Sequence, residues 1–303
     1  MTKPAIIEVA MNGELPKRAN PQVPRSPDEV AEDALRCIAA GASVLHNHTG
    51  DPVIGGSGRH DPEPYRVAWS QVLERHPDAL FYPTMPGGGP GGGPGGGPGG
   101  APGQSIEQRY AHIEQLARWG LLGLGLVDPG TTDLGRFHPD GRPRAGDTVY
   151  QNTWADGVYM VEACRRMNAG MSVSIFEPGF MRFMLGYAEA DALPPGGFIK
   201  FYFGGPRAGF GLPPTEKALD AYLDMLEGTG LPWLVSVQGG DVAACGMARL
   251  ALERGGHLQV GLEPSGDRTR SNSQLVEEAV GIARACGREP ASFAEARGLI
   301  GLP

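Results

Sequence analysis

Short β-rich runs recur eight times along the chain, and each is followed by a segment with helical periodicity. We expect strands at 5–11, 42–49, 79–85, 121–127, 171–177, 197–203, 232–238 and 258–263. Eight strand and helix units in about 260 residues are typical of a (β/α)8 TIM barrel, an α/β fold. We therefore predict a single TIM-barrel domain over residues 1–303.

The segments between these runs carry helix start and stop signals. Residues 26–41, 214–228, 241–255 and 271–287 each begin with polar residues and end at a glycine, and 292–300 is expected to form a final short helix. A doubly wound sheet is the alternative fold, but no Gly-x-Gly-x-x-Gly motif follows the first run.

Charge and hydropathy exclude several classes of partner. The formal net charge is −8, and no basic cluster suggests binding to nucleic acid or to an anionic membrane surface. No stretch approaches the roughly 18 uninterrupted apolar residues of a transmembrane helix, so we expect a soluble protein that is not exported. The cysteines lie far apart in helix-like segments without zinc or redox spacing, which predicts buried, reduced thiols in a cytoplasmic protein. They are Cys37, Cys164, Cys245 and Cys286.

Polar side chains gather at the predicted carboxyl ends of the strands, the face at which TIM barrels carry out chemistry. In chain order they are Glu14, His46, His48, Thr84, Asp128, Glu177, Gln238 and Glu263. A polar ring at one rim of a barrel predicts a functional site there.

Two histidines in this ring, His46 and His48, are one residue apart on the second predicted strand. Side chains alternate across a strand, so both imidazoles can reach one metal ion; two hydrogen-bonded polar residues at a strand end are the alternative. The first and eighth strands of a barrel are neighbours, and Glu263 shares a strand face with Gln259, which should point its carboxylate inward. A helix cap or a pair with an arginine is the alternative for Glu263. Two histidines and one carboxylate leave an open coordination position, as in catalytic zinc sites.

Motifs spread in order along the chain carry a resemblance to a known family. They are Glu14, Asn20-Pro21, Pro24-Arg-Ser-Pro-Asp-Glu-Val-Ala31, Gly41-Ala-Ser-Val-Leu-His-Asn-His48, Gly255-Gly-His-Leu-Gln-Val-Gly-Leu-Glu263 and Arg270-Ser-Asn-Ser-Gln-Leu-Val276. Together they resemble the β-keto acid cleavage enzymes, which include the 3-keto-5-aminohexanoate cleavage enzyme. The resemblance implies a TIM barrel, a zinc ion (Zn2+) on His46, His48 and Glu263, and a homo-oligomer, either a tetramer or a dimer.

The implied reaction takes a β-keto acid and acetyl-CoA to acetoacetate and a new acyl-CoA. A β-keto acid can chelate a divalent cation through its keto oxygen and carboxylate, and the ion stabilises the enolate that attacks the thioester. The CoA thiolate then attacks the other carbonyl and splits the carbon chain in a retro-Claisen step. Glu14 matches a family site residue, with a solvated loop acid as the alternative. Thr84 lies near the serine with which the family anchors the substrate carboxylate, and Gly87 is a further substrate-binding candidate.

The chain departs from the family pattern beside the third predicted metal ligand. The family usually ends in Arg-Val-Gly-Leu-Glu-Asp, and its Arg and Asp are credited with proton transfer. Gln259 and Pro264 stand at these positions, and neither side chain is an acid or a base. Asp128 is our first candidate for a replacement base and Lys200 the second, although an outward or rim position is the alternative for Lys200.

Three functions stay open at this point. The first is the zinc-dependent cleavage. The second is an ordinary metallohydrolase barrel, which we disfavour because amidohydrolases place His-x-His on the first strand and add ligands that are absent here. The third is a relative with altered chemistry, either another enolate-forming enzyme or a noncatalytic protein that binds metal and a keto acid.

Residues 86–103 are a low-complexity loop insertion of Pro-Gly-Gly-Gly repeats after the third run. This composition cannot bury a core, and we expect a cover over the site or a subunit contact. Phosphate binding by its backbone is less favoured, because no Gly-Lys-Ser/Thr is present and proline removes a donor at every fourth position.

Overall fold

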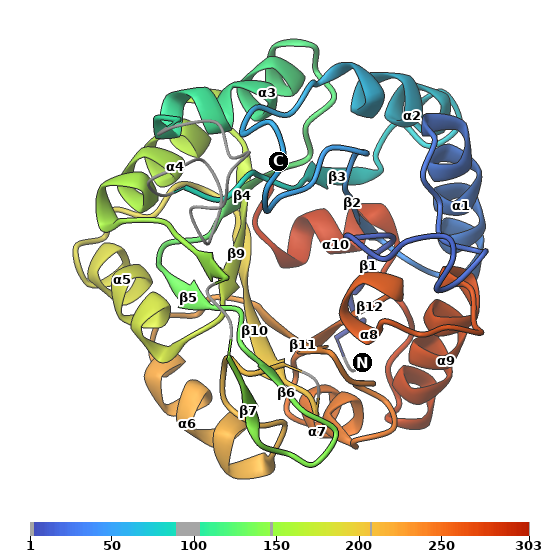
Figure 1. The fold of residues 1–303 in the computed structure, drawn as a ribbon, viewed down its shortest axis with the longest axis vertical. Helices are drawn as coiled ribbons and strands as arrows, with labels where there is room; N and C mark the ends of the chain where they lie inside the picture. The colour runs from blue at the N-terminus through green and yellow to red at the C-terminus, as the bar shows by residue number, and fades with distance from the viewer. Residues whose placement is uncertain (1–2, 89–103, 146–147, 207, 303) are drawn as a thin grey trace.

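Eight parallel strands form a nearly closed barrel in the computed structural model of this chain, hydrogen-bonded in the order β3-β2-β1-β12-β11-β10-β9-β4 (Figure 1). The structure describes residues 3–88, 104–145, 148–206 and 208–302. The strands are β1 Ile7–Ala10, β2 Val44–Asn47, β3 Leu80–Pro83, β4 Leu124–Val127, β9 Gly170–Ile175, β10 Gly197–Gly204, β11 Trp233–Gln238 and β12 His257–Val260. Each coincides with one of the runs expected from the sequence, so the predicted (β/α)8 TIM barrel is confirmed.

A ring of helices surrounds the strands (Figure 1). They are α1 Pro27–Ala40, α2 Glu63–Leu73, α3 Ile106–Arg118, α4 Trp154–Met167, α5 Pro178–Glu189, α6 Glu216–Leu226, α7 Met247–Glu253 and α9 Asn272–Ala285. The expected signals operate at α1, where Ser26 and Glu29 form a reciprocal capping box and Gly41 ends the helix at a φ of 115°. The start predicted at Asp241 is wrong: its side chain accepts from the next backbone N–H groups and holds a turn, and α7 begins only at Met247.

Smaller elements close the two ends of the barrel. Helix α10, Phe293–Leu299, lies at the amino end, where the N–H of Gly197 donates to Ile300 O at 2.7 Å. Helix α8, Leu262–Ser265, follows β12 at the carboxyl end. The connection from β4 to α4 carries two short antiparallel pairs: β5 Thr132–Asp133 with β8 Val149–Tyr150, and β6 Arg136–Phe137 with β7 Pro143–Arg144.

Apolar side chains of the strands and helices form one buried core between the two layers. Phe201 of β10, for example, stacks on Tyr222 of α6 with ring centroids 4.6 Å apart. The prediction of buried cysteines is right for Cys37 and Cys164. It is wrong for Cys245, which is exposed in the turn before α7. Cys286, at the end of α9, is only partly buried, although it packs against the core.

Two further expectations from the sequence concern membrane spans and the Pro-Gly-Gly-Gly insertion. In the described part of the chain, every helix is too short or too polar to span a bilayer. Most of the Pro-Gly-Gly-Gly insertion, residues 89–103, lies outside the described residues, so its role as a cover or subunit contact stays a prediction. Its first residues are held, since the N–H of Gly88 donates to Gln151 O at 2.9 Å.

Candidate metal centre and active site

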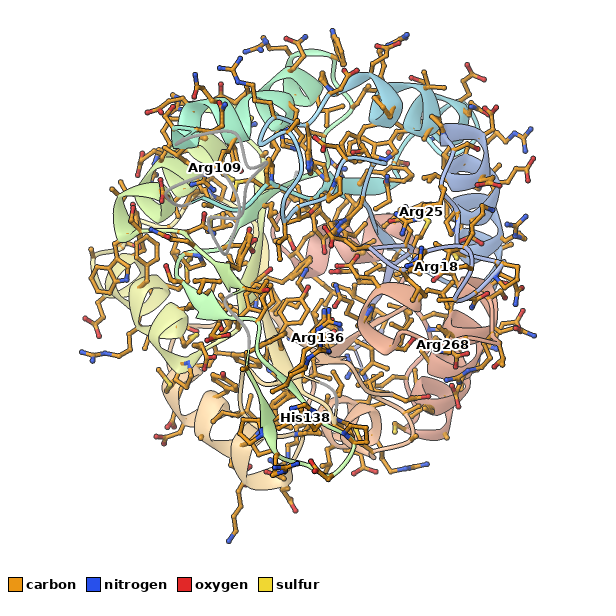
Figure 2. The ribbon with its side chains drawn as sticks, viewed as in Figure 1. Arg18, Arg25, Arg109, Arg136, His138 and Arg268 are labelled. Atoms are coloured by element: carbon orange, nitrogen blue, oxygen red, sulfur yellow. The ribbon has the colours of Figure 1, made fainter. Side chains whose placement is uncertain are left out.

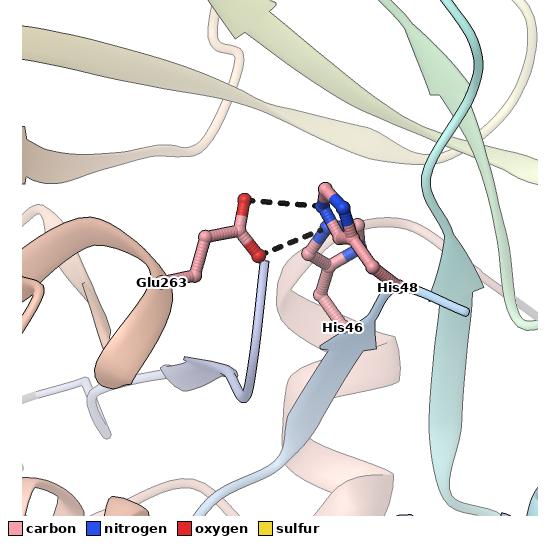
Figure 3. Close-up of side chains that lie close together, drawn as sticks. All are labelled: His46, His48 and Glu263. Atoms are coloured by element: carbon pink, nitrogen blue, oxygen red, sulfur yellow. Dashed lines mark ion pairs between the residues drawn. The ribbon is translucent and has the colours of Figure 1, made fainter. Parts of the chain in front are cut away.

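His46, His48 and Glu263 converge at the carboxyl end of the barrel (Figure 3). One oxygen of Glu263 lies 3.4 Å from Nε2 of His46, and the other lies 3.4 Å from Nε2 of His48. All three side chains are buried or partly buried, and their ligand atoms lie within 4.8 Å of one another. Among the described residues, this is the group of three side chains with the chemistry and spacing to hold a metal ion.

The two histidines point inward because of strand alternation. Asn47 between them faces the opposite way and accepts a hydrogen bond from the Trp69 indole of α2 at 2.8 Å. The end of β2 is held by Asn12, whose side chain accepts from His48 N at 2.7 Å and donates to His48 O at 3.1 Å. Nδ1 of His46 lies 3.1 Å from the carbonyl oxygen of Tyr82, the arrangement that leaves Nε2 free to bind a metal.

Glu263 reaches the histidines from a different element than the sequence suggested. It lies in the first turn of α8 and not on the eighth strand, because β12 ends at Val260 and Gly261 turns the chain at a φ of 128°. A Cβ on Gly261 would lie 2.1 Å from Ala10 O, and a Cβ on Gly13 would lie 2.6 Å from Cγ of Glu263. Two glycines therefore make room for the third ligand.

The distances and protonation states fit a metal ion. The edges of a tetrahedral zinc site with bonds of about 2.0–2.1 Å are roughly 3.3–3.4 Å long, which matches both separations of Glu263 from the histidines. Burial, opposed by Glu263, lowers the pKa of His46 to about 3, so its ring is neutral at pH 7. Burial acts to raise the pKa of Glu263, but His48 and His46 outweigh it and the pKa is lowered.

The ligand group opens into a cavity of about 620 Å³ at the barrel mouth. Its lining includes every strand-end candidate except Glu177: Glu14, His46, His48, Thr84, Asp128, Gln238 and Glu263. Glu177 instead accepts hydrogen bonds from Thr132 and the N–H of Gly211 and so ties two loops together. A cavity of this size accommodates a substrate beside the metal ligands.

Asp128 is a buried carboxyl group in the cavity wall. It directly follows β4 and is 4% exposed. Its Oδ2 accepts a hydrogen bond from the Tyr150 hydroxyl at 2.6 Å, while its Oδ1 has no hydrogen-bond partner among the described residues. Burial raises the pKa of Asp128, although hydrogen bonds from Tyr150 and Ser174 and the charge of Lys200 oppose the shift.

A charged layer lies inside the barrel, and only one of its members, Lys200, was a candidate from the sequence. Lys200 of β10 is 1% exposed and donates to Glu8 of β1 at 3.2 Å, so the rim position considered for this lysine is wrong. Lys200 also donates to the hydroxyls of Tyr82 and Ser172. The available signal was a single charged residue within each of two otherwise apolar strands, IEVA and GFIKFYFG.

The remaining substrate-binding candidates occupy different positions. The Glu14 carboxylate is exposed at the cavity and accepts from the N–H of Val53 at 2.6 Å. Thr84 is buried in the cavity wall. Gly87 is not among the residues that line the cavity, and its N–H donates to Val53 O at 3.1 Å.

Comparison with known proteins gives the family. The model of the beta-keto acid cleavage enzyme family matches residues 4–302. This chain belongs to that family. The resemblance carried by the motifs is thereby confirmed over almost the whole chain.

Two relatives align with this chain almost end to end. The 3-keto-5-aminohexanoate cleavage enzyme of Fusobacterium nucleatum is 25% identical over 100% of this chain and 99% of that protein. The 3-oxoadipate:acetyl-CoA acetyltransferase of Cupriavidus necator is 27% identical over 100% of this chain and 96% of that protein. Both relatives are enzymes.

Solved structures support the fold. The apo structure of ObcA superposes with a TM-score of 0.67 at 17% identity, over 93% of this chain and 66% of the ObcA chain. This chain thus spans just under two thirds of ObcA. At this identity, the likeness shows the shared TIM-barrel fold.

The departure from the beta-keto acid cleavage enzyme pattern has a structural counterpart. Gln259 is buried and donates to Glu8 at 2.5 Å and to the Tyr202 hydroxyl at 3.2 Å. Pro264 lies in α8 and lines the cavity. Neither side chain can exchange a proton, whereas Asp128, a buried acid, lines the same cavity.

Proposed function

We propose that this chain is a zinc-dependent enzyme that converts a β-keto acid and acetyl-CoA into acetoacetate and an acyl-CoA. The observation that carries the proposal is the His46, His48 and Glu263 group at the wall of a large cavity, in a chain of the beta-keto acid cleavage enzyme family. The names of its relatives, a keto acid cleavage enzyme and an acetyl-CoA acetyltransferase, support the same class of reaction.

The proposed zinc ligands are the two imidazole Nε2 atoms and the carboxylate of Glu263. Zinc accepts this mixture of nitrogen and oxygen ligands, and three protein ligands leave one position for substrate. When bound, the ion supplies the positive charge that stabilises negative charge developing on the keto acid. The protein's own part is to orient the ligands, through Tyr82 O for His46 and Asn12 for His48.

We assign proton transfer to Asp128. A general base works best when its pKa lies near the working pH, and burial shifts the pKa of Asp128 in that direction. Its unpartnered Oδ1 is the atom available to accept a proton, because Oδ2 is held by Tyr150. Lys200 is the weaker candidate because its ammonium group already donates to Glu8, Tyr82 and Ser172.

The steps balance with this single base. Asp128 takes a proton from C2 of the keto acid, and C2 attacks the acetyl carbonyl carbon with release of the CoA thiolate. The thiolate adds to the original keto carbon, the C2–C3 bond breaks, and C2 takes the proton back from Asp128. Acetoacetate and an acyl-CoA leave, and no oxidant or further reactant is needed.

The other candidates receive binding roles in this proposal. We propose that the Thr84 hydroxyl in the cavity wall binds the substrate carboxylate, and that the exposed Glu14 carboxylate binds the far end of the substrate. Gly87 acts indirectly: like Glu14, it bonds the backbone of Val53, so together they hold one loop at the cavity edge.

Isotope transfer tests the reaction directly. The purified protein is incubated with acetyl-CoA labelled with ¹³C in the acetyl group and a panel of β-keto acids, and the products are identified by mass spectrometry. We expect label in acetoacetate and an unlabelled new acyl-CoA, with about one zinc per chain by metal analysis. Hydrolysis of the keto acid or of the thioester, without label in acetoacetate, would instead support a metallohydrolase.

Three variants separate the roles. His46→Ala should lose both zinc and turnover, whereas His76→Ala, a histidine outside the ligand group, should keep both. Asp128→Asn should keep zinc but lower kcat by about 10²–10⁴-fold, the usual contribution of a general base. Unchanged kcat in Asp128→Asn would overturn the assignment of the base.

A relative with altered chemistry is the second candidate, favoured by one observation: Gln259 and Pro264 offer no titratable group where the family has its Arg and Asp. Zinc binding and keto acid binding without any transfer of label would support this candidate.

We further propose a homo-oligomer, a tetramer or a dimer, acting in the cytoplasm. Trp154, 64% exposed on α4, and Val158, 44% exposed one turn later, support a subunit contact, which light scattering measures.

A further inference from the structure

Three arginines line the cavity mouth. Arg136 and Arg144 line it from the β6–β7 hairpin, and Arg268 lines it from the loop after α8. Figure 2 shows Arg136 over the middle of the barrel and Arg268 beside α8. Within the described ranges, no ion pair joins any of the three to an acidic side chain. Arg268 is far from the other two in the sequence, so folding brings it to the pair on the hairpin and creates a basic cluster.

The hairpin holds two of these charges side by side. Arg136 and Arg144 are direct partners in the antiparallel register of β6 and β7. Like charges in this position destabilise a strand pair unless an anion lies between them. Arg142 lies on the same hairpin, but it forms an ion pair with Asp140 at 2.8 Å and is not among the residues that line the cavity. The two cavity-facing arginines therefore lack the compensation that their neighbour has.

The composition of the mouth indicates a particular kind of anion. Phe137, next to Arg136, is 43% exposed and also lines the cavity. Arginine binds phosphate with two parallel hydrogen bonds, and an exposed aromatic ring stacks on a nucleotide base. The whole chain carries a net charge of −8, so a positively charged mouth is not a consequence of overall composition. Arginines beside an aromatic ring match a phosphorylated nucleotide.

We propose that Arg136, Arg144 and Arg268 bind the phosphates of the adenosine 3′-phosphate 5′-diphosphate end of the CoA thioester, with the adenine against Phe137. The choice of CoA as the ligand rests on the proposed function. The same cavity holds the arginines and the metal ligands. The nucleotide end is therefore bound at the mouth while the thioester extends toward His46 and His48.

Calorimetry tests the site without turnover. Adenosine 3′,5′-bisphosphate and CoA are titrated into the wild type, Arg136→Gln/Arg144→Gln, and the matched control Arg142→Gln. For each ligand, we expect the wild type and the control to have the same affinity. The double variant should bind each ligand at least about 10-fold more weakly, because charge-assisted hydrogen bonds are lost. Added salt should weaken wild-type binding. Equal binding by all three proteins, or inorganic phosphate binding as tightly as the bisphosphate, would overturn the proposal.

Kinetics separate this proposal from the proposed function. With acetyl-CoA, the double variant should show a raised KM and an unchanged kcat, whereas with acetyl-pantetheine, which lacks the nucleotide, it should match the wild type. Arg268→Gln should raise the KM for acetyl-CoA in the same way. A wild type that turns over neither thioester but binds the bisphosphate would contradict the proposed reaction and support the nucleotide site. Turnover with equal KM values for acetyl-CoA in the wild type and the double variant would support the proposed reaction and contradict the nucleotide site. Equal melting temperatures confirm that the variants fold.

Discussion

Replacing Lys200 by methionine should destabilise the barrel by about 3–5 kcal/mol, the usual cost of removing one partner from a buried ion pair. Nζ of Lys200 lies 3.2 Å from Oε1 of Glu8, and these side chains are 1% and 0% exposed. Methionine nearly keeps the length of the side chain but removes its charge. The Glu8 carboxylate then stays in the interior with hydrogen bonds from Tyr82 and Gln259 but without a cation.

This cost converts into a measurable melting temperature. An unfolding entropy of about 2.1 cal/mol/K per residue for 303 residues means that each kcal/mol shifts the melting temperature by about 1.6 °C. Lys200→Met should therefore melt about 5–8 °C below the wild type in calorimetry at pH 7. Metal content should be retained, because Lys200 is not one of the three ligand residues.

A second substitution tests whether charge is the reason. Glu8→Gln combined with Lys200→Met removes the unpaired charge and keeps an oxygen that can accept from Tyr82, so the double variant should recover most of the lost stability. A melting temperature for Lys200→Met within about 2 °C of the wild type would refute the reasoning. So would a double variant as unstable as the single one, since the loss would then come from packing.

Three other predictions concern pH, backbone and metal. Burial lowers the pKa of His60 to about 4 and the pKa values of His112 and His257 to about 3. Below about pH 6.5 the unfolded chain therefore binds more protons than the folded chain, and the melting temperature should fall between pH 6.5 and pH 4. A melting temperature that does not change over this range would contradict the prediction. Gly261→Ala should melt well below the wild type, because its Cβ would lie 2.1 Å from a backbone oxygen of β1, whereas Gly281→Ala in α9, with open space around it, should be neutral or stabilising by up to about 1 kcal/mol. Chelation of zinc should lower the melting temperature and added zinc should restore it, since a ligand at 1,000 times its Kd stabilises by about 4 kcal/mol; no change in either direction would count against the metal centre.

Features that depend on local periodicity could be predicted from the sequence. A repeat of strand and helix patterns fixes the barrel, because few folds bury eight parallel strands with intervening helices. The inward direction of His46 and His48 follows from their separation by one residue, and the outward Asn47 shows the same alternation.

Features that depend on distant partners could not. The inward position of Lys200 depends on Glu8, which is 192 residues away in the sequence. The sequence predicted the place of Glu263 through strand alternation, but a turn at Gly261 and a short helix bring it there instead. The cluster of arginines at the mouth likewise exists only because loops from opposite parts of the chain meet above one cavity.

The third metal ligand is held in place by residues that contribute no ligand atom. Gly13 leaves the space that Cγ of Glu263 fills, and Gly261 supplies the backbone turn before it. A designer who transplants this centre into another barrel must therefore carry both glycines along with the three ligand side chains. A graft of the ligands alone would keep the two histidines on their strand and leave the carboxylate out of reach.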